Sequence, residues 1–130
     1  MGRHVFLDSI AVADCAMEVV GDDLDDLFAT AARAVAEVMV DPATVRRVIE
    51  RDVELAAPSL DLLLYDWLSE LIYLKDAEQL VFPDAEVRVR GDVLDRARAA
   101  LRADPKAVTF HRFALEPYAG GWRARVVIDV

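Results

Sequence analysis

Two segments in the middle of the chain repeat apolar residues at helical spacing. The first runs from Leu24 to Met39, follows an acidic stretch in which Asp22 or Asp23 can cap a helix, and stops before Pro42. In the second, Ser59 is placed to cap a helix with a wide apolar face, made of Leu60, Leu63, Leu64, Trp67, Leu68, Leu71, Ile72 and Leu74. The pattern predicts two amphipathic helices, the second of them largely buried.

Apolar and polar residues alternate in the segments on either side of these helices. Residues 4–20 predict one or two strands, with Cys15, Met17 and Val19 on one face and Asp14 on the other. Residues 51–59 predict a short strand that ends at Pro58, and residues 81–91 predict another. The charged stretch 92–105 is interpreted as a short surface helix.

A hairpin is expected at the end of the sequence. Residues 107–116 and 122–130 flank PYAGG, whose glycines can adopt the positive φ angles of a tight turn. In the second arm Trp122 and Ile128 share one face, and Asp129 lies on the other. Strands at both ends and helices between them predict an α+β fold, with antiparallel sheets packed against two main amphipathic helices. Without a linker or repeat, residues 1–130 are expected to form a single domain.

Composition narrows the classes of function. The 130 residues carry a formal net charge of −9, which argues against direct binding to a nucleic-acid backbone. The same charge is compatible with holding a hard cation or with docking on a basic protein. Asp8 and Asp14 interrupt the apolar N-terminal stretch, so we expect no membrane segment and a soluble, cytoplasmic protein.

Few residues offer enzymatic chemistry. Cys15 is the only cysteine and is interpreted as a buried thiol rather than a nucleophile. Gly-x-Ser-x-Gly and phosphate-loop motifs are missing, and His4 and His111 are the only histidines. A metal-assisted hydrolase needs a general base near an open metal position, and the sequence shows none. We therefore do not expect an enzyme.

Carboxylates at the two ends of the sequence form the most informative combination. Should the terminal strands be neighbours, Asp14, Asp129 and the terminal carboxylate of Val130 would converge, and hard cations prefer such oxygen ligands. Asp129 could instead be solvated or pair with Arg123 or Arg125. A second acidic set, on the second helix, is either a solvated stripe or part of a site: Asp66, Glu70 and Asp76.

Four segments resemble the archease family, in order along the chain. They are AD followed by GDDLDDLFATAARAV, LLLYDWLSELIYLKDAEQLVF, KAVTFH and GGWRARVVIDV, and the resemblance extends from about Phe6 to Val130. It implies a compact α+β fold, a bound divalent cation such as calcium, and a chaperone-like function. That function is to activate an RtcB-type RNA ligase by promoting its guanylylated histidine intermediate and repeated turnover, without joining RNA itself.

The resemblance also assigns residues. It implies metal ligation by Asp14, Asp129 and Val130, a contact between Lys106 and the ligase, and a role for His111 at the end of KAVTFH. Lys106 could equally be an exposed lysine at a strand start, and His111 a packing or surface residue. Residues 11–14 read Ala-Val-Ala-Asp where the family usually has His-Thr-Ala-Asp, and the segment from Leu7 to Asp14 is about two residues longer than usual. The alternative hypothesis is therefore a divergent interaction module that has lost the cation and the ligase role.

Overall fold

The computed structural model describes residues 2–7, 14–85, 88–93, 105 and 107–129. Two α-helices and seven strands occupy these residues. In chain order they are β1 (Arg3–Leu7), β2 (Asp14–Gly21), α1 (Leu24–Met39), β3 (Ile49–Asp52), α2 (Leu60–Glu78), β4 (Leu80–Ala85), β5 (Arg88–Val93), β6 (Ala107–Tyr118) and β7 (Gly121–Asp129), with one turn of 3₁₀-helix at Pro42–Thr44.

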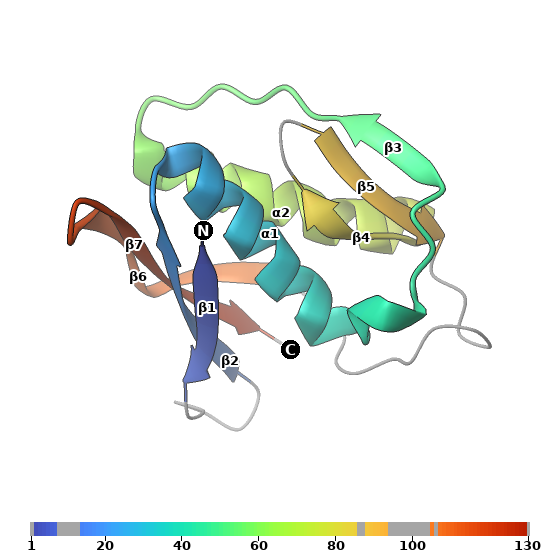
Figure 1. Ribbon diagram of the computed structural model, residues 1–130, viewed down its shortest axis with the longest axis horizontal. Coiled ribbons are helices and arrows are strands. Elements are labelled where there is room, and N and C mark those ends of the chain that lie inside the picture. Colours follow the sequence, from blue (N-terminus) through green and yellow to red (C-terminus); the bar gives the residue numbers. More distant parts are fainter. Residues whose placement is uncertain (1, 8–13, 86–87, 94–104, 106, 130) are drawn as a thin grey trace.

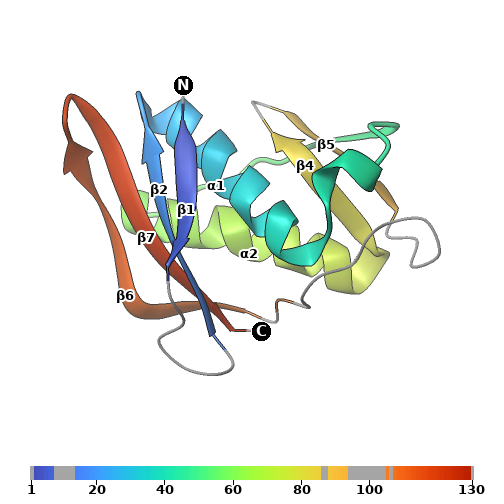
Figure 2. The same cartoon turned by 60° about the horizontal axis from the view of Figure 1, so that its bottom comes forward.

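The strands form two antiparallel sheets. One has four strands in the order β1-β2-β7-β6, and the other has three in the order β3-β5-β4. Helix α1 packs against β2 and β4, and Figure 2 shows the four-stranded sheet on one side of it and β4 and β5 on the other. Helix α2 packs beside α1 and against β6 and β4 (Figure 1). The predicted α+β class with antiparallel sheets and two helices is confirmed.

Helix α1 begins in a network of aspartates. The N-cap Asp23 accepts a hydrogen bond from the Asp26 N–H at 2.8 Å. The Asp26 carboxylate accepts from the Asp22 N–H at 2.8 Å and from the Gly2 N–H at 2.9 Å. This reciprocal arrangement resembles a capping box and satisfies donors that a helix start leaves open. These carboxylates therefore stabilise the helix start.

Helix α2 has the predicted start, but its burial differs from the prediction. Ser59 is the N-cap and accepts from the Leu62 N–H at 3.3 Å, while Trp67 Nε1 donates to the Phe28 carbonyl of α1 at 2.9 Å. Leu60 was expected in the apolar face but is 41% exposed. Its position in the first turn explains the difference, because the buried face begins one turn later, at Leu64.

The core between the sheets combines residues from both helices with the inner face of the four-stranded sheet. Its largest fully buried side chains are Met17, Leu27, Leu64, Leu68, Ile128, Val19, Val35, Val40, Val81 and Val126. Burial of this apolar surface is the main favourable contribution to folding.

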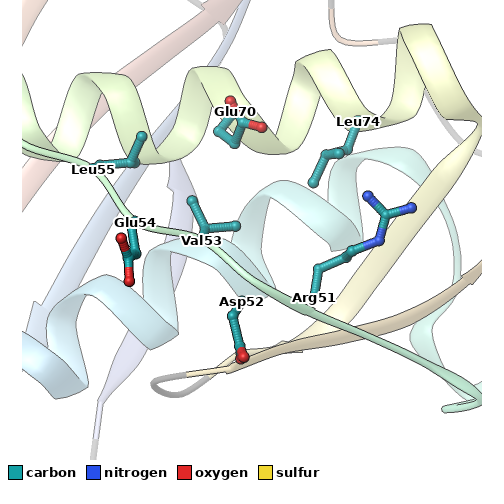
Figure 3. Close-up of a pocket in the computed structure, with 7 residues that line it drawn as sticks. All are labelled: Arg51, Asp52, Val53, Glu54, Leu55, Glu70 and Leu74. Atoms are coloured by element: carbon teal, nitrogen blue, oxygen red, sulfur yellow. The ribbon is translucent and has the colours of Figure 1, made fainter.

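Two strand predictions need correction. The strand predicted over 51–59 is β3, Ile49–Asp52, because its pairing with β5 ends at the Asp52–Arg88 pair. The alternation at Val53 and Leu55 is real, but these side chains point from an extended connection toward α2 (Figure 3).

The single strand predicted over 81–91 is instead two antiparallel strands, β4 and β5, in which Leu80 lies opposite Val93. The register shifts between Val81 and Asp84, around Pro83, and β4 is an edge strand, where proline is tolerated. The helix predicted over 92–105 is wrong at 92–93, which belong to β5. Residues 94–104 lie outside the described part of the chain.

The C-terminal hairpin is confirmed, but of its two glycines only Gly120 has the predicted positive φ angle. The positive φ angles of its turn belong to Ala119, at 49°, and Gly120, at 83°. A Cβ atom on Gly121 would lie 2.3 Å from the Gly21 carbonyl oxygen, so this glycine permits a close approach of β7 to the end of β2.

Candidate functional site: the acidic end of the four-stranded sheet

Strand β2 begins where strand β7 ends. Asp14, the first residue of β2, lies directly opposite Asp129, the last residue of β7. On its other side Asp129 lies opposite Ala107, the first residue of β6. Figure 2 shows these three strand ends together, beside the C-terminus. The two aspartates singled out at opposite ends of the sequence are thus neighbours across one ladder.

The core fixes this register. Met17 lies opposite Val126 and Val19 opposite Ala124, and all four are buried toward the helices. A slip of one residue would turn this apolar row to the other face, so the burial of the row determines the alignment. Residues at even positions of β2 and odd positions of β7 consequently share the face away from the helices, Asp14 and Asp129 among them.

An apolar row adjoins the acidic pair on that face. Ala16 and Val127 lie opposite each other, and both are 0% exposed. Beside them, the Thr109 hydroxyl donates to the Val127 carbonyl at 3.1 Å. Charges next to such a row are less shielded by water than charges on an open surface.

The arginines of β7 have partners of their own. Arg125 lies 3.4 Å from Glu18, and Arg123 forms a salt bridge with Glu116 and stacks 4.4 Å above the Tyr118 ring. Within the described part of the chain, Asp129 forms no ion pair with either arginine. The alternative in which Asp129 serves as an arginine partner is therefore not supported.

The other predicted site residues are less fully placed. His111 belongs to β6, but its side chain, like that of Asp14, lies outside the description, as do Lys106 and Val130 entirely. Among the described residues, no group of three or more histidine, cysteine, aspartate or glutamate side chains is arranged to hold a metal ion. Metal ligation by Asp14, Asp129 and Val130, and partner contacts by Lys106 and His111, stay predictions.

Comparison with known proteins identifies the family. The archease protein family (MTH1598/TM1083) matches residues 6–130. The chain is 35% identical to protein archease of Methanosarcina mazei over 91% of this chain and 90% of that protein. It is also 35% identical to protein archease of Archaeoglobus fulgidus, over 98% and 99% of the two chains. The chain belongs to the archease family.

Solved structures agree with this assignment. The solution structure of Methanobacterium thermoautotrophicum protein 1598 superposes with a TM-score of 0.78 at 31% identity, and the match covers 98% of each chain. A Thermotoga maritima crystal structure, described as an archease and possible chaperone, gives 0.59 at 17% identity over 92% of this chain and 93% of that one. The second match shows the shared fold alone.

The other candidate groups of this archease are not arranged for catalysis. Cys15 is half-buried rather than fully buried, and burial raises the pKa of its thiol, which disfavours the reactive thiolate. His4 is occupied by Glu37, with 2.8 Å between Nε2 and Oε2. Neither group forms a nucleophile and base pair with another described residue.

A pocket of about 210 Å³ lies between α2 and the chain after β3. Figure 3 shows Arg51 and Glu70 on the side of α2, and Asp52 and Glu54 pointing away from that helix. The Arg51 guanidinium is held by Glu78 in two hydrogen bonds, of 2.8 and 3.2 Å. The lining of the pocket contains no histidine, cysteine or hydroxyl residue, so it shows no arrangement for nucleophilic catalysis.

One residue of interest was missed in the sequence. Lys75 is 6% exposed, at the C-terminal end of α2. The available signal was its spacing, since it follows Ile72 by three positions and Leu71 by four, which places it on the apolar face.

None of the described helices of this archease has the length and apolarity needed to cross a membrane.

Proposed function

We propose that this archease is a non-enzymatic, cytoplasmic activator of an RtcB-type RNA ligase, and that it binds a divalent cation, calcium, through Asp14, Asp129 and Val130. Through protein contact it promotes guanylylation of the ligase and repeated turnover. The observation that carries the proposal is the direct opposition of Asp14 and Asp129 in neighbouring strands.

Like charges at opposed positions of a ladder destabilise a sheet, and opposed Cβ atoms are about 4.5–5.5 Å apart. Two aspartates at such positions therefore cost stability unless a cation or proton lies between them. Calcium takes six to eight oxygen ligands, many of them carboxylates, and a third ligand from Val130, directly after Asp129, fits this preference.

Of the contact residues proposed by family resemblance, His111 belongs to β6, the strand that pairs with β7, and Lys106 comes directly before that strand in the sequence. We propose that Lys106 reaches the ligase while the cation stabilises the carboxylates behind it. The net charge of −9 favours approach to the basic cleft of a ligase that must attract RNA, and disfavours direct binding of RNA by this protein.

The test is a ligation assay with purified cognate ligase in excess over archease. The parent protein should raise multiple-turnover ligation and ligase guanylylation, and Asp129→Ala should abolish the gain. Glu54→Gln is the matched control, because it removes one carboxylate from an exposed position after β3, outside the four-stranded sheet. A parent protein without effect on the ligase ends the proposal.

The sequence at residues 11–14 favours a second candidate function. Ala-Val-Ala-Asp stands where the family usually has His-Thr-Ala-Asp, which fits an interaction module that keeps the fold and has lost the cation. Calorimetric titration with calcium separates the two candidates. Binding that Asp14→Ala removes supports the activator, whereas equal, negligible heats for parent and variant support the divergent module.

A further inference from the structure

Lys75 connects the end of α2 to the acidic end of the four-stranded sheet. Its ammonium group donates to the Pro105 carbonyl, with 2.6 Å between Nζ and O, and lies 2.7 Å from the Asp76 carboxylate. The lysine side chain is 5% exposed, whereas that of Asp76 is 58% exposed. The positive charge of Lys75 is therefore buried next to the Pro105 carbonyl, and the exposed carboxylate of Asp76 balances it.

The position of Pro105 gives this bond its significance. Pro105 is itself buried and lies two residues before Ala107, the residue opposite Asp129. The Lys75 bond and the Ala107–Asp129 pair therefore hold the backbone on both sides of Lys106. The chain has only two lysines among its 15 basic residues, and the first binds the residue that precedes the second.

Stability alone gives no reason for a lysine here. Burying an ammonium group costs free energy, and an apolar side chain in place of a buried charge is often neutral or stabilising. What an apolar side chain lacks is a directed hydrogen bond to one carbonyl. We infer that Lys75 is a positioning residue, which fixes the start of β6, and with it Lys106, relative to Asp14 and Asp129. The inference rests on the proposed function for its effect on ligase activation.

The first readout is independent of any ligase. Lys75→Met should speed amide exchange at Ala107 and Val108 by at least about tenfold, because a hydrogen bond to a charged group is lost, while exchange at Val126 in the core stays as in the parent. It should speed cleavage after Lys106 by lysyl endopeptidase to a similar extent. Lys75→Arg, which keeps the charge and donors, should recover at least part of the protection. Unchanged exchange and cleavage in Lys75→Met would overturn the inference.

The second readout is a double-mutant cycle in the ligation assay. Lys75→Met should lower maximal activation at saturating archease, and it should cause no further loss in a Lys106→Ala background, because both changes act through the same residue. Independent, multiplicative losses would reject the positioning role. If the parent protein does not activate the ligase, the proposed function fails, and the exchange and cleavage results still decide whether Lys75 anchors β6.

A variant that fails to fold is replaced rather than interpreted. Lys75→Gln keeps a polar terminus but ends one atom short of the lysine nitrogen, so it should fold and show the same local loss of protection. Full protection in a folded Lys75→Gln protein would count against the anchor.

Discussion

Asp14 and Asp129 lie directly opposite each other in β2 and β7, although 114 residues lie between them in the sequence. The burial of Met17 against Val126 holds this register, so the acidic pair is a consequence of core packing. The two arginines of β7 pair with Glu18 and Glu116, so within the described part of the chain neither of them pairs with Asp129.

Removing one member of the pair should therefore stabilise the cation-free protein. Without divalent cation, Asp129→Asn relieves the repulsion and should raise the free energy of unfolding by about 0.2–1 kcal/mol. In calcium at about 100 times its dissociation constant the parent should gain about 2.7 kcal/mol, and the variant should gain nothing. Urea unfolding in chelator and in calcium measures both effects.

Glu54→Gln controls for the change in net charge, because it removes a carboxylate outside the four-stranded sheet. It should leave the calcium effect intact. An Asp129→Asn protein that calcium stabilises as much as the parent would show that Asp129 is not a ligand.

Two neighbouring glycines should respond differently to the same substitution. Gly121→Ala places a Cβ atom 2.3 Å from the Gly21 carbonyl, a backbone atom that cannot swing aside, and should cost about 2–3 kcal/mol. Gly120→Ala meets no atom within 4 Å, and its cost should be the smaller penalty of a positive φ angle, about 1 kcal/mol. Urea unfolding of both variants tests this order, and equal costs would contradict the close approach of β7 to β2.

The sequence predicted those features of the fold that depend on local patterns of residues. Capping residues and helical spacing located both helices, and strict alternation placed Asp129 on the face opposite to that of the buried Ile128. It could not predict that β2 and β7 are neighbours, because strand pairing depends on contacts between distant residues. Alternation also misled at Val53 and Leu55, which point toward α2 from an extended connection and so produce the same pattern as a strand. Lys75 was missed because its partner, the Pro105 carbonyl, is a backbone group that any sequence carries.

The two faces of α2 should differ in their tolerance of truncation. Leu68 is fully buried, so Leu68→Ala removes packed atoms and leaves a cavity, at a cost of about 2–5 kcal/mol. Leu62 is 36% exposed on the same helix, and Leu62→Ala should cost less than about 1 kcal/mol. Denaturant unfolding compares them, and similar costs would contradict a difference in burial between the two faces of α2.

The start of α1 should give the protein a specific sensitivity to acid. The Asp22 N–H, followed by that of Gly2, lowers the pKa of the Asp26 carboxyl in the folded state. Because the folded pKa is below the unfolded one, this stabilisation is fully present above the ordinary aspartate pKa, about 3.9, and is lost as the pH falls through the lower folded value.

Asp26→Asn should therefore be less stable than the parent at pH 7, and the difference should shrink once the pH falls below about 4. Asp25→Asn serves as the control, since it removes an exposed carboxylate from the same first turn. Unfolding free energies measured between pH 7 and pH 2.5 test the effect. A deficit of the same size for Asp26→Asn across that range would mean that its carboxylate charge does not stabilise the helix start.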